Sequence, residues 1–163
     1  AIEAGVAMIH QHFMLVPTLT VAENVALGLV DNGVLLNTSD VADRISDLSV
    51  QYGLAVDPSS YVWQLAVGER QRVEILKALY RDCRLLILDE PTEGIQPSII
   101  QDIGRALRLL VDEFGMTVLL VEQYYEFARH LADHYVVMSR GEVVARGEGA
   151  KMEEEGVREL IAV

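Results

Sequence analysis

The chain has 163 residues, 51% of them hydrophobic, and a formal net charge of −12 at pH 7. This length suffices for one domain with a sizeable core. The acidic charge argues against nucleic acid as a partner and against adsorption to anionic lipid, because both depend on basic surface. No apolar run approaches the roughly 18 residues that a membrane span requires. Cys83 is the single cysteine, so an internal disulfide is excluded.

Strand-like and helix-like segments alternate along the chain. We expect strands at 6–9, 85–88, 116–121 and 135–138, with 142–145 pairing back as a hairpin. The run at 116–121 is expected to be a second buried strand. We expect helices beginning near Thr20, Ser39, Gly68, Pro97 and Tyr124, and an acidic amphipathic helix from Lys151. The sequence Asp31-Asn32-Gly33 predicts a turn. Such alternation predicts an α/β fold with a mainly parallel sheet.

Local signals mark several helix starts. Thr20 and Glu23 form a capping-box pattern. Ser39 is the expected N-cap of a helix that buries Val41, Ile45, Leu48 and Tyr52. Gly68 is expected to lie just before its helix, and Pro97 suits the first turn of a long one.

The most informative stretch is the apolar run Leu85–Leu88, which leads directly into Asp89, Glu90 and Pro91. So short a run closed by a turn signal predicts a strand buried on both faces of a parallel sheet. The two acids then lie at the carboxyl end of that strand, where open α/β sheets bind ligands. One acid there can hold Mg²⁺ and the next can polarise an attacking water. The pattern favours a nucleotide-hydrolysing site.

A phosphate-binding loop of the form G-x-x-x-x-G-K-[ST] is absent from these residues. Its lysine must directly follow a glycine. The lysines of the chain are Lys77, which follows Leu76, and Lys151, which follows Ala150. The sequence therefore predicts the residues that bind the metal and the attacking water in a nucleotide site, without the loop that binds the phosphates.

The order of motifs resembles the ATP-binding subunit of an ABC transporter over essentially the whole chain. Met8-Ile9-His10-Gln11 is similar to the Q-loop, and the run 65–72 (Leu-Ala-Val-Gly-Glu-Arg-Gln-Arg) is similar to the signature motif. Leu85–Asp89 resembles the Walker B strand, followed by Glu90 as the catalytic glutamate. The resemblance implies a P-loop NTPase-like sheet with a helical subdomain, without its N-terminal strands and phosphate loop.

The resemblance also implies roles for individual residues. Asp89 and Gln11 would hold Mg²⁺, and Glu90 and Gln123 would act in catalysis. The ATP-contacting residues would be Gln11, Ala66, Gly68, Glu69 and Gln71. Three positions depart from the family pattern. Ala66 stands where a serine is expected, Gln96 where many families have an aspartate, and Gln123 where a histidine is usual.

Organisation and partners are likewise implied by the resemblance. The chain would be a partial ATP-binding domain, with a helical subdomain at about 30–80, core at 1–29 and 81–148, and a C-terminal helix at 149–163. It would pair with a second ATP-binding subunit as a homo- or heterodimer. It would dock on transmembrane permease subunits, serve a solute-binding protein indirectly, and lie on the inner, cytoplasmic face of the membrane. We expect a piece of a longer protein, inactive by itself.

Several alternatives stay open. Residues up to Thr92 look like the simple-sugar or nucleoside importers, and residues from Glu93 look like the urea and branched-chain amino-acid importers. The chain is thus either a mosaic of two related subunits or the product of drift in one lineage. A non-catalytic module that pairs with a complete subunit, or an ABC ATPase not devoted to transport, would show the same motifs.

Overall fold

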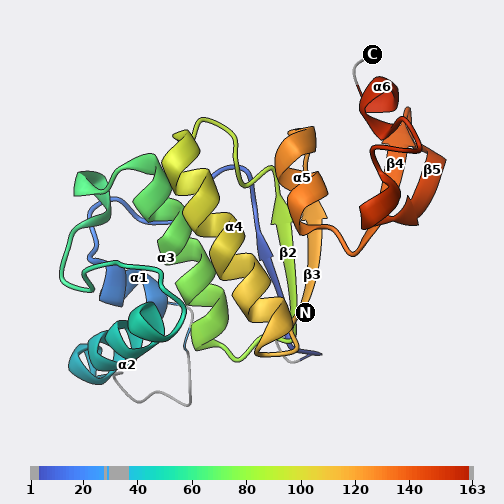
Figure 1. The fold of residues 1–163 in the computed structure, drawn as a ribbon. Coiled ribbons are helices and arrows are strands. Elements are labelled where there is room, and N and C mark those ends of the chain that lie inside the picture. Colours follow the sequence, from blue (N-terminus) through green and yellow to red (C-terminus); the bar gives the residue numbers. More distant parts are fainter. Residues whose placement is uncertain (1–3, 28, 30–36, 162–163) are drawn as a thin grey trace. The chain divides into compact units, whose positions relative to one another are not determined.

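The computed structural model describes residues 4–27, 29 and 37–161, in two compact units, Ala1–Val121 and Glu122–Val163. The first unit holds a parallel sheet of β1 (Val6–Ile9), β2 (Leu85–Asp89) and β3 (Thr117–Val121), in that spatial order. Its helices are α1 (Val21–Ala26), α2 (Thr38–Gln51), α3 (Val67–Tyr80) and α4 (Pro97–Asp112), with a 3₁₀ turn at Val62–Gln64. The predicted parallel α/β fold is confirmed (Figure 1). The turn expected at 31–33 lies outside the described residues.

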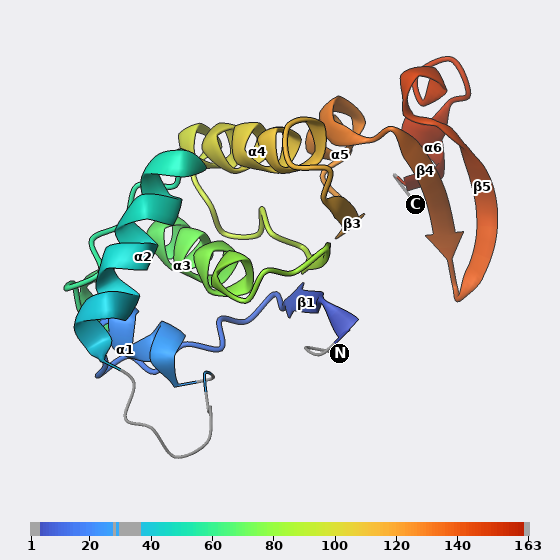
Figure 2. The same ribbon diagram turned by 90° about the horizontal axis from the view of Figure 1, so that it is seen from below.

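Helices α3 and α4 cover one face of this sheet (Figure 2). Leu86 and Leu88 of β2 are completely buried, whereas Ile87 between them is half-buried. The expectation that β2 is buried on both faces is therefore wrong. On the outer strand β3, Leu119 and Val121 are exposed, so the buried strand expected at 116–121 is also corrected. Both corrections have one cause, because the described helices of this unit pack on a single face.

The helix starts follow their local signals closely, with two shifts. The capping box of Thr20 and Glu23 is confirmed at α1, and Pro97 opens α4. Helix α2 is capped by Asn37, whose side chain accepts a hydrogen bond from Ser39 N, so the N-cap expected at Ser39 is wrong. Gly68 lies inside the first turn of α3 and not before it.

The second unit consists of a hairpin and short helices. Strands β4 (His134–Ser139) and β5 (Glu142–Glu148) pair antiparallel, which confirms the predicted hairpin. Around them lie α5 (Tyr125–Leu131), a 3₁₀ turn at Gly149–Lys151 and α6 (Val157–Ile161). The tail is thus not one helix from Lys151, since Gly156 adopts a left-handed backbone (φ +64°) between the 3₁₀ turn and α6. The unit has its own small core of Tyr135, Val137, Met152 and Val157.

Within the described ranges, no helix combines the length and the apolar character that crossing a membrane requires.

Candidate functional site

The acidic pair lies where β2 ends. Asp89 is the last residue of β2 and sits opposite Val121 of β3. Glu90 follows with a left-handed backbone (φ +47°), and its N–H donates to Val121 O over 2.9 Å. A non-glycine residue adopts this conformation at a cost that the surrounding fold must offset, and such residues gather at functional sites. The turn thus fixes Glu90 at the carboxyl edge of the sheet.

Gln11 joins this pair from the neighbouring strand. It follows β1, whose carboxyl end lies beside that of β2 because the two strands are parallel. Its Nε2 donates to Glu90 Oε2 over 3.3 Å and also to Glu93 Oε2. Glu93 reaches this position because a tight turn, with Glu93 N donating to Glu90 O over 3.2 Å, folds the chain back. The structure therefore brings together Gln11 and Glu90, which sequence reasoning selected, and Glu93, which it missed.

The oxygen donors at this edge suit Mg²⁺. That ion prefers oxygen ligands, keeps several waters, and is usually held by one or two carboxylates plus phosphate oxygens. Asp89 and Gln11 offer a carboxylate and an amide oxygen of this kind. In the described ranges, no group of three or more His, Cys, Asp and Glu side chains is arranged to hold a metal. The donor set fits an ion that takes most of its ligands from water and phosphate.

The start of α3 carries the other sequence-predicted residues. Ala66 is the N-cap, and its N–H donates to Glu69 Oε2 over 2.8 Å. The Glu69 carboxylate therefore already lies at the positive end of the helix dipole and satisfies one of the free amides there. Gly68 is pressed against α4, since a Cβ built on it would lie 2.5 Å from Ile99 Cγ2. Packing alone thus requires glycine at this position.

Gln71 and Gln123 are the remaining two candidates. Gln71 is only 3% exposed, and its Nε2 has no hydrogen-bond partner among the described residues. Gln123 is exposed and belongs to the second unit, two residues beyond β3. Its N–H and that of Tyr124 both donate to Glu122 Oε1 over 2.9 Å. Among the described residues, the Gln11 side chain bonds Glu90 and Glu93, and the Glu69 side chain bonds Ala66 N.

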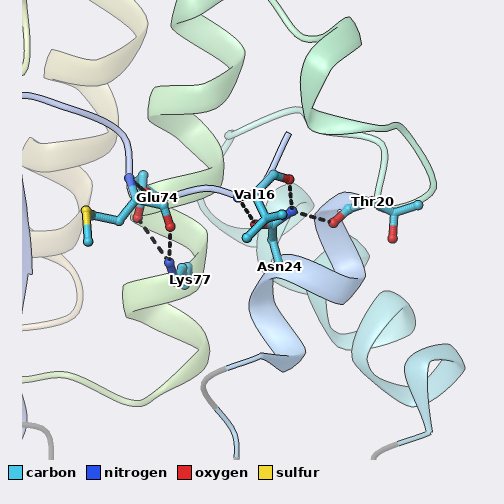
Figure 3. Close-up of polar contacts among 6 residues, drawn as sticks. Val16, Thr20, Asn24, Glu74 and Lys77 are labelled. Carbon is cyan, nitrogen blue, oxygen red and sulfur yellow. Dashed lines mark hydrogen bonds and ion pairs between the residues drawn. The ribbon is translucent and has the colours of Figure 1, made fainter. Parts of the chain in front are cut away.

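Buried polar side chains hold the segment that follows Gln11 (Figure 3). Asn24, buried on α1, accepts from Val16 N over 2.7 Å and donates to Val16 O over 3.1 Å. Glu74, buried on α3, accepts from Met14 N over 2.7 Å, and Lys77 Nζ donates to Met14 O over 3.1 Å. Sequence reasoning missed all three side chains, because no short motif links Asn24 to Val16, eight residues away, or Glu74 and Lys77 to Met14, which lies 60 residues before Glu74.

The same segment turns apolar side chains to the surface. Met14 is 68% exposed and Val16 is also exposed. Residues 58–63 run alongside, with Trp63 N donating to Pro17 O over 3.0 Å, and they present exposed Tyr61 and Trp63. Met14, Val16, Tyr61 and Trp63 are called the Met14 surface below.

Comparisons with known proteins agree with these observations. The family described as ABC transporter matches residues 1–93. The nucleoside import ATP-binding protein of Lactococcus lactis is 39% identical over 145 residues, covering 88% of this chain and 28% of its own length. The glucose import ATP-binding protein of Haloferax volcanii is 39% identical over 173 residues, covering 88% of this chain and 31% of its own length. The chain thus spans less than a third of the length of these two relatives.

Solved structures show the same fold. A nucleotide-free ATP-binding cassette from an ABC transporter superposes with a TM-score of 0.80 at 21% identity, covering 96% of this chain and 66% of its own. A dimeric ATP-binding cassette in a post-hydrolysis state with ADP and Pi gives 0.74 at 26% identity, covering 88% and 62%. The match to the nucleoside-import relative extends beyond Thr92, because 145 residues exceed that part of the chain. A mosaic origin stays a prediction. The chain belongs to the ABC transporter family, among relatives of its importer-type ATP-binding subunits.

Proposed function

We propose that Gln11, Asp89 and Glu90 form the part of an ATP site that binds Mg²⁺ and the attacking water. The chain would belong to the ATP-hydrolysing subunit of an ABC importer, which powers solute uptake across the cytoplasmic membrane. The observation that carries this proposal is the 3.3 Å contact of Gln11 Nε2 with Glu90 Oε2 at the carboxyl ends of two parallel strands, directly after Asp89. Ligands of open α/β sheets bind at this edge. The sequence identity of the chain to import ATP-binding proteins supports the same role.

Each residue at the edge has a task in this mechanism. Glu90 accepts a hydrogen bond from the attacking water and orients it, which is the protein's main contribution to phosphoryl transfer to water. Asp89 and Gln11 hold Mg²⁺, and that ion neutralises charge on the phosphate oxygens when bound. Gln11 also senses whether the site is filled, because its amide is shared with Glu90 and Glu93. Gln123 donates to the γ-phosphate from its place after β3.

The start of α3 would serve the ATP of a facing subunit. The Gly68 amide and the helix dipole favour an anion there. Ala66 and Glu69 complete this surface, and Gln71, three residues after Gly68, is buried on the same helix. The Glu69 carboxylate, which accepts from Ala66 N, would have to release that N–H for a phosphate to bind there. We infer a second ATP-binding subunit as the partner, as a homo- or heterodimer. The dimeric cassette with ADP and Pi supports this inference.

The Met14 surface is the proposed contact with the transmembrane permease subunits. It combines exposed apolar side chains with a backbone fixed by buried polar groups, so it presents a preformed shape. Such patches mark interaction sites. Contact with a permease places the chain on the inner, cytoplasmic face of the membrane and links it only indirectly to a solute-binding protein. The helical subdomain at about 30–80 would carry part of this contact.

A non-catalytic module is the second candidate function. The specific observation that favours it is the Glu69 carboxylate at the start of α3, where it would repel a phosphate. The burial of Gln71 also favours a non-catalytic module, because a buried side chain is not available to contact ATP. Such a module would pair with a complete subunit and hydrolyse nothing itself.

Calorimetric titration of the chain with Mg-ATP tests the proposal. We expect weak binding and no turnover by the chain alone, because the amides and lysine of a phosphate loop supply much of the affinity. The chain is then fused behind a segment that carries a phosphate-binding loop of the form G-x-x-x-x-G-K-[ST]. This fusion should hydrolyse ATP, Glu90→Gln should abolish its turnover, and Asp89→Asn should weaken its Mg-ATP binding. A fusion that binds Mg-ATP tightly but is equally slow with Glu90 or Gln at position 90 would favour the non-catalytic module.

A further inference from the structure

Met14 is held by a charged pair from α3. It lies three residues after Gln11. Its N–H donates to Glu74 Oε1 over 2.7 Å, and its C=O accepts from Lys77 Nζ over 3.1 Å (Figure 3). Glu74 and Lys77 are one helical turn apart, and Lys77 Nζ lies 3.7 Å from Glu74 Oε2. One turn of α3 therefore binds both polar groups of a single peptide residue, and we call this arrangement the Met14 clamp.

The clamp is built from groups that are costly to bury. The Glu74 side chain is 8% exposed and that of Lys77 is 20% exposed. Burying long charged side chains costs desolvation and rotamer freedom, unless hydrogen bonds and an opposite charge offset that loss. Hydrogen bonds to charged groups are the stronger kind. The segment is held again two residues later, where Asn24 takes both polar groups of Val16. The chain between Gln11 and Pro17 therefore follows α3 and α1 closely.

We propose that Glu74 and Lys77 are positioning residues for Gln11. This proposal rests on the proposed function for the role of Gln11 itself. Glu74 lies eight residues after the N-cap Ala66, which is about 12 Å along the helix. The same helix, α3, therefore carries both the proposed phosphate-binding residues at its start and the Met14 clamp further along. The clamp fixes the backbone three residues after Gln11, whose Nε2 lies 3.3 Å from Glu90 Oε2.

The test needs no nucleotide and uses the chain as it is. Nuclear magnetic resonance measures the hydrogen exchange rate of the Met14 amide and the position of the Gln11 side-chain amide signal. Glu74→Gln keeps an oxygen acceptor for Met14 N–H. The double variant Glu74→Lys/Lys77→Glu keeps the ion pair but presents a donor to the N–H and an acceptor to the C=O. The pair Glu148–Lys151 has the same spacing on the exposed second unit and serves as the matched control for a charge swap.

We expect the swap at 74 and 77 to speed Met14 exchange roughly tenfold or more and to move the Gln11 signal. Glu74→Gln should retain most of the protection and leave the Gln11 signal near its original position. The swap at 148 and 151 should change neither. Faster Met14 exchange with an unmoved Gln11 signal would mean that the clamp only stabilises the segment, and it would overturn the proposal.

A milder variant covers the case in which the swapped chain does not fold. Lys77→Met keeps the hydrocarbon stem and the Glu74 bond but removes the donor to Met14 O. In this variant the Gln11 side-chain amide signal should move by a smaller amount than in the double variant. An unmoved signal would again contradict the proposal that the clamp positions Gln11. Failure of the fusion to hydrolyse ATP would refute the proposed function but would not affect the magnetic resonance results on the clamp. Failure of the proposed function and failure of the clamp proposal are therefore distinguishable.

Discussion

Gln11 Nε2 donates to Glu90 Oε2 over 3.3 Å, and this bond ties the end of β1 to the residue that follows β2. The same nitrogen contacts Glu93. With Nε2 on two carboxylates, Oε1 is the Gln11 atom that can accept from a water or ligate a cation. A single amide thus connects the proposed metal and water functions, and we expect that the shorter side chains of aspartate and asparagine could not replace it.

Gln11→Glu should destabilise the chain in a salt-dependent way. The change places three carboxylates together, and exposed charge pairs of this kind contribute roughly 0.5 kcal/mol. Salt screens interactions between exposed charges, so the loss of unfolding free energy should shrink as the ionic strength rises. Urea unfolding at low and at high salt measures the difference. Gln11→Ala is the control, and a loss of equal size at both salt concentrations would contradict the explanation.

Gly68→Ala should destabilise the first unit by about 1–3 kcal/mol, because the added methyl overpacks a closed contact. The new Cβ would lie 2.5 Å from Ile99 Cγ2 and 3.1 Å from Ile99 Cγ1. Adding Ile99→Ala removes both atoms, so the double variant should lose less than the sum of the single losses. Chemical unfolding measures all three. Val67→Ala, on the exposed position beside Gly68, should have little effect, and strictly additive losses would argue against the Ile99 contact.

Asn24→Ala should cost about 2–4 kcal/mol of unfolding free energy. Asn24 is 2% exposed, and its side chain bonds Val16 N, Val16 O and Thr20 O. Removal leaves buried backbone groups without partners. Asn37, an exposed N-cap, offers a matched asparagine, and its replacement by alanine should cost only about 1 kcal/mol. Equal losses at the two positions in thermal or urea unfolding would refute the burial argument.

Glu23 should titrate below its ordinary range in the folded chain. Hydrogen bonds from the Thr20 backbone N–H and hydroxyl lower the pKa of the Glu23 carboxyl from 4.5. Because the folded-state pKa is depressed, the carboxylate's contribution to stability is present above about pH 4.5 and is lost as the pH falls through the lowered value. Carbon-detected titration of the Glu23 carboxyl checks the direction. Thr20→Ala, which removes only the hydroxyl, should return the pKa part of the way.

The elements that depend on local signals were predictable from the sequence. The strand before Asp89, the Thr20 capping box and the hairpin around Gly141 each depend on residues within a few positions of one another. The hydrogen bonds of the capping box and of the hairpin turn need no distant partner. The strand before Asp89 does pair with the distant β1 and β3, but its short apolar run closed by Asp89, Glu90 and Pro91 already marks it as a strand. The cap of α2 was misplaced because Asn37 and Ser39 are both good caps, and only the geometry selects Asn37.

The wrong and missed features depend on distant residues. Burial of β3 follows from which face the helices cover, and an apolar run alone cannot reveal that. Glu74 reads as an ordinary polar residue in a helix, yet its partner Met14 lies 60 residues earlier. Glu93 meets Gln11 across 82 residues. The site assignments all stay predictions: Gln11, Ala66, Gly68, Glu69, Gln71, Asp89, Glu90 and Gln123.

Strand β3 affects how this chain must be handled. Leu119 and Val121 project from the outer strand of the described sheet, on the side opposite the buried Leu86 and Leu88. An apolar outer strand is a template for pairing between molecules, and its association grows with concentration. Turbidity of a concentrated sample should therefore appear before any loss of helix content. Leu119→Lys should delay this association, and light scattering across a dilution series would show a smaller average particle size for the variant.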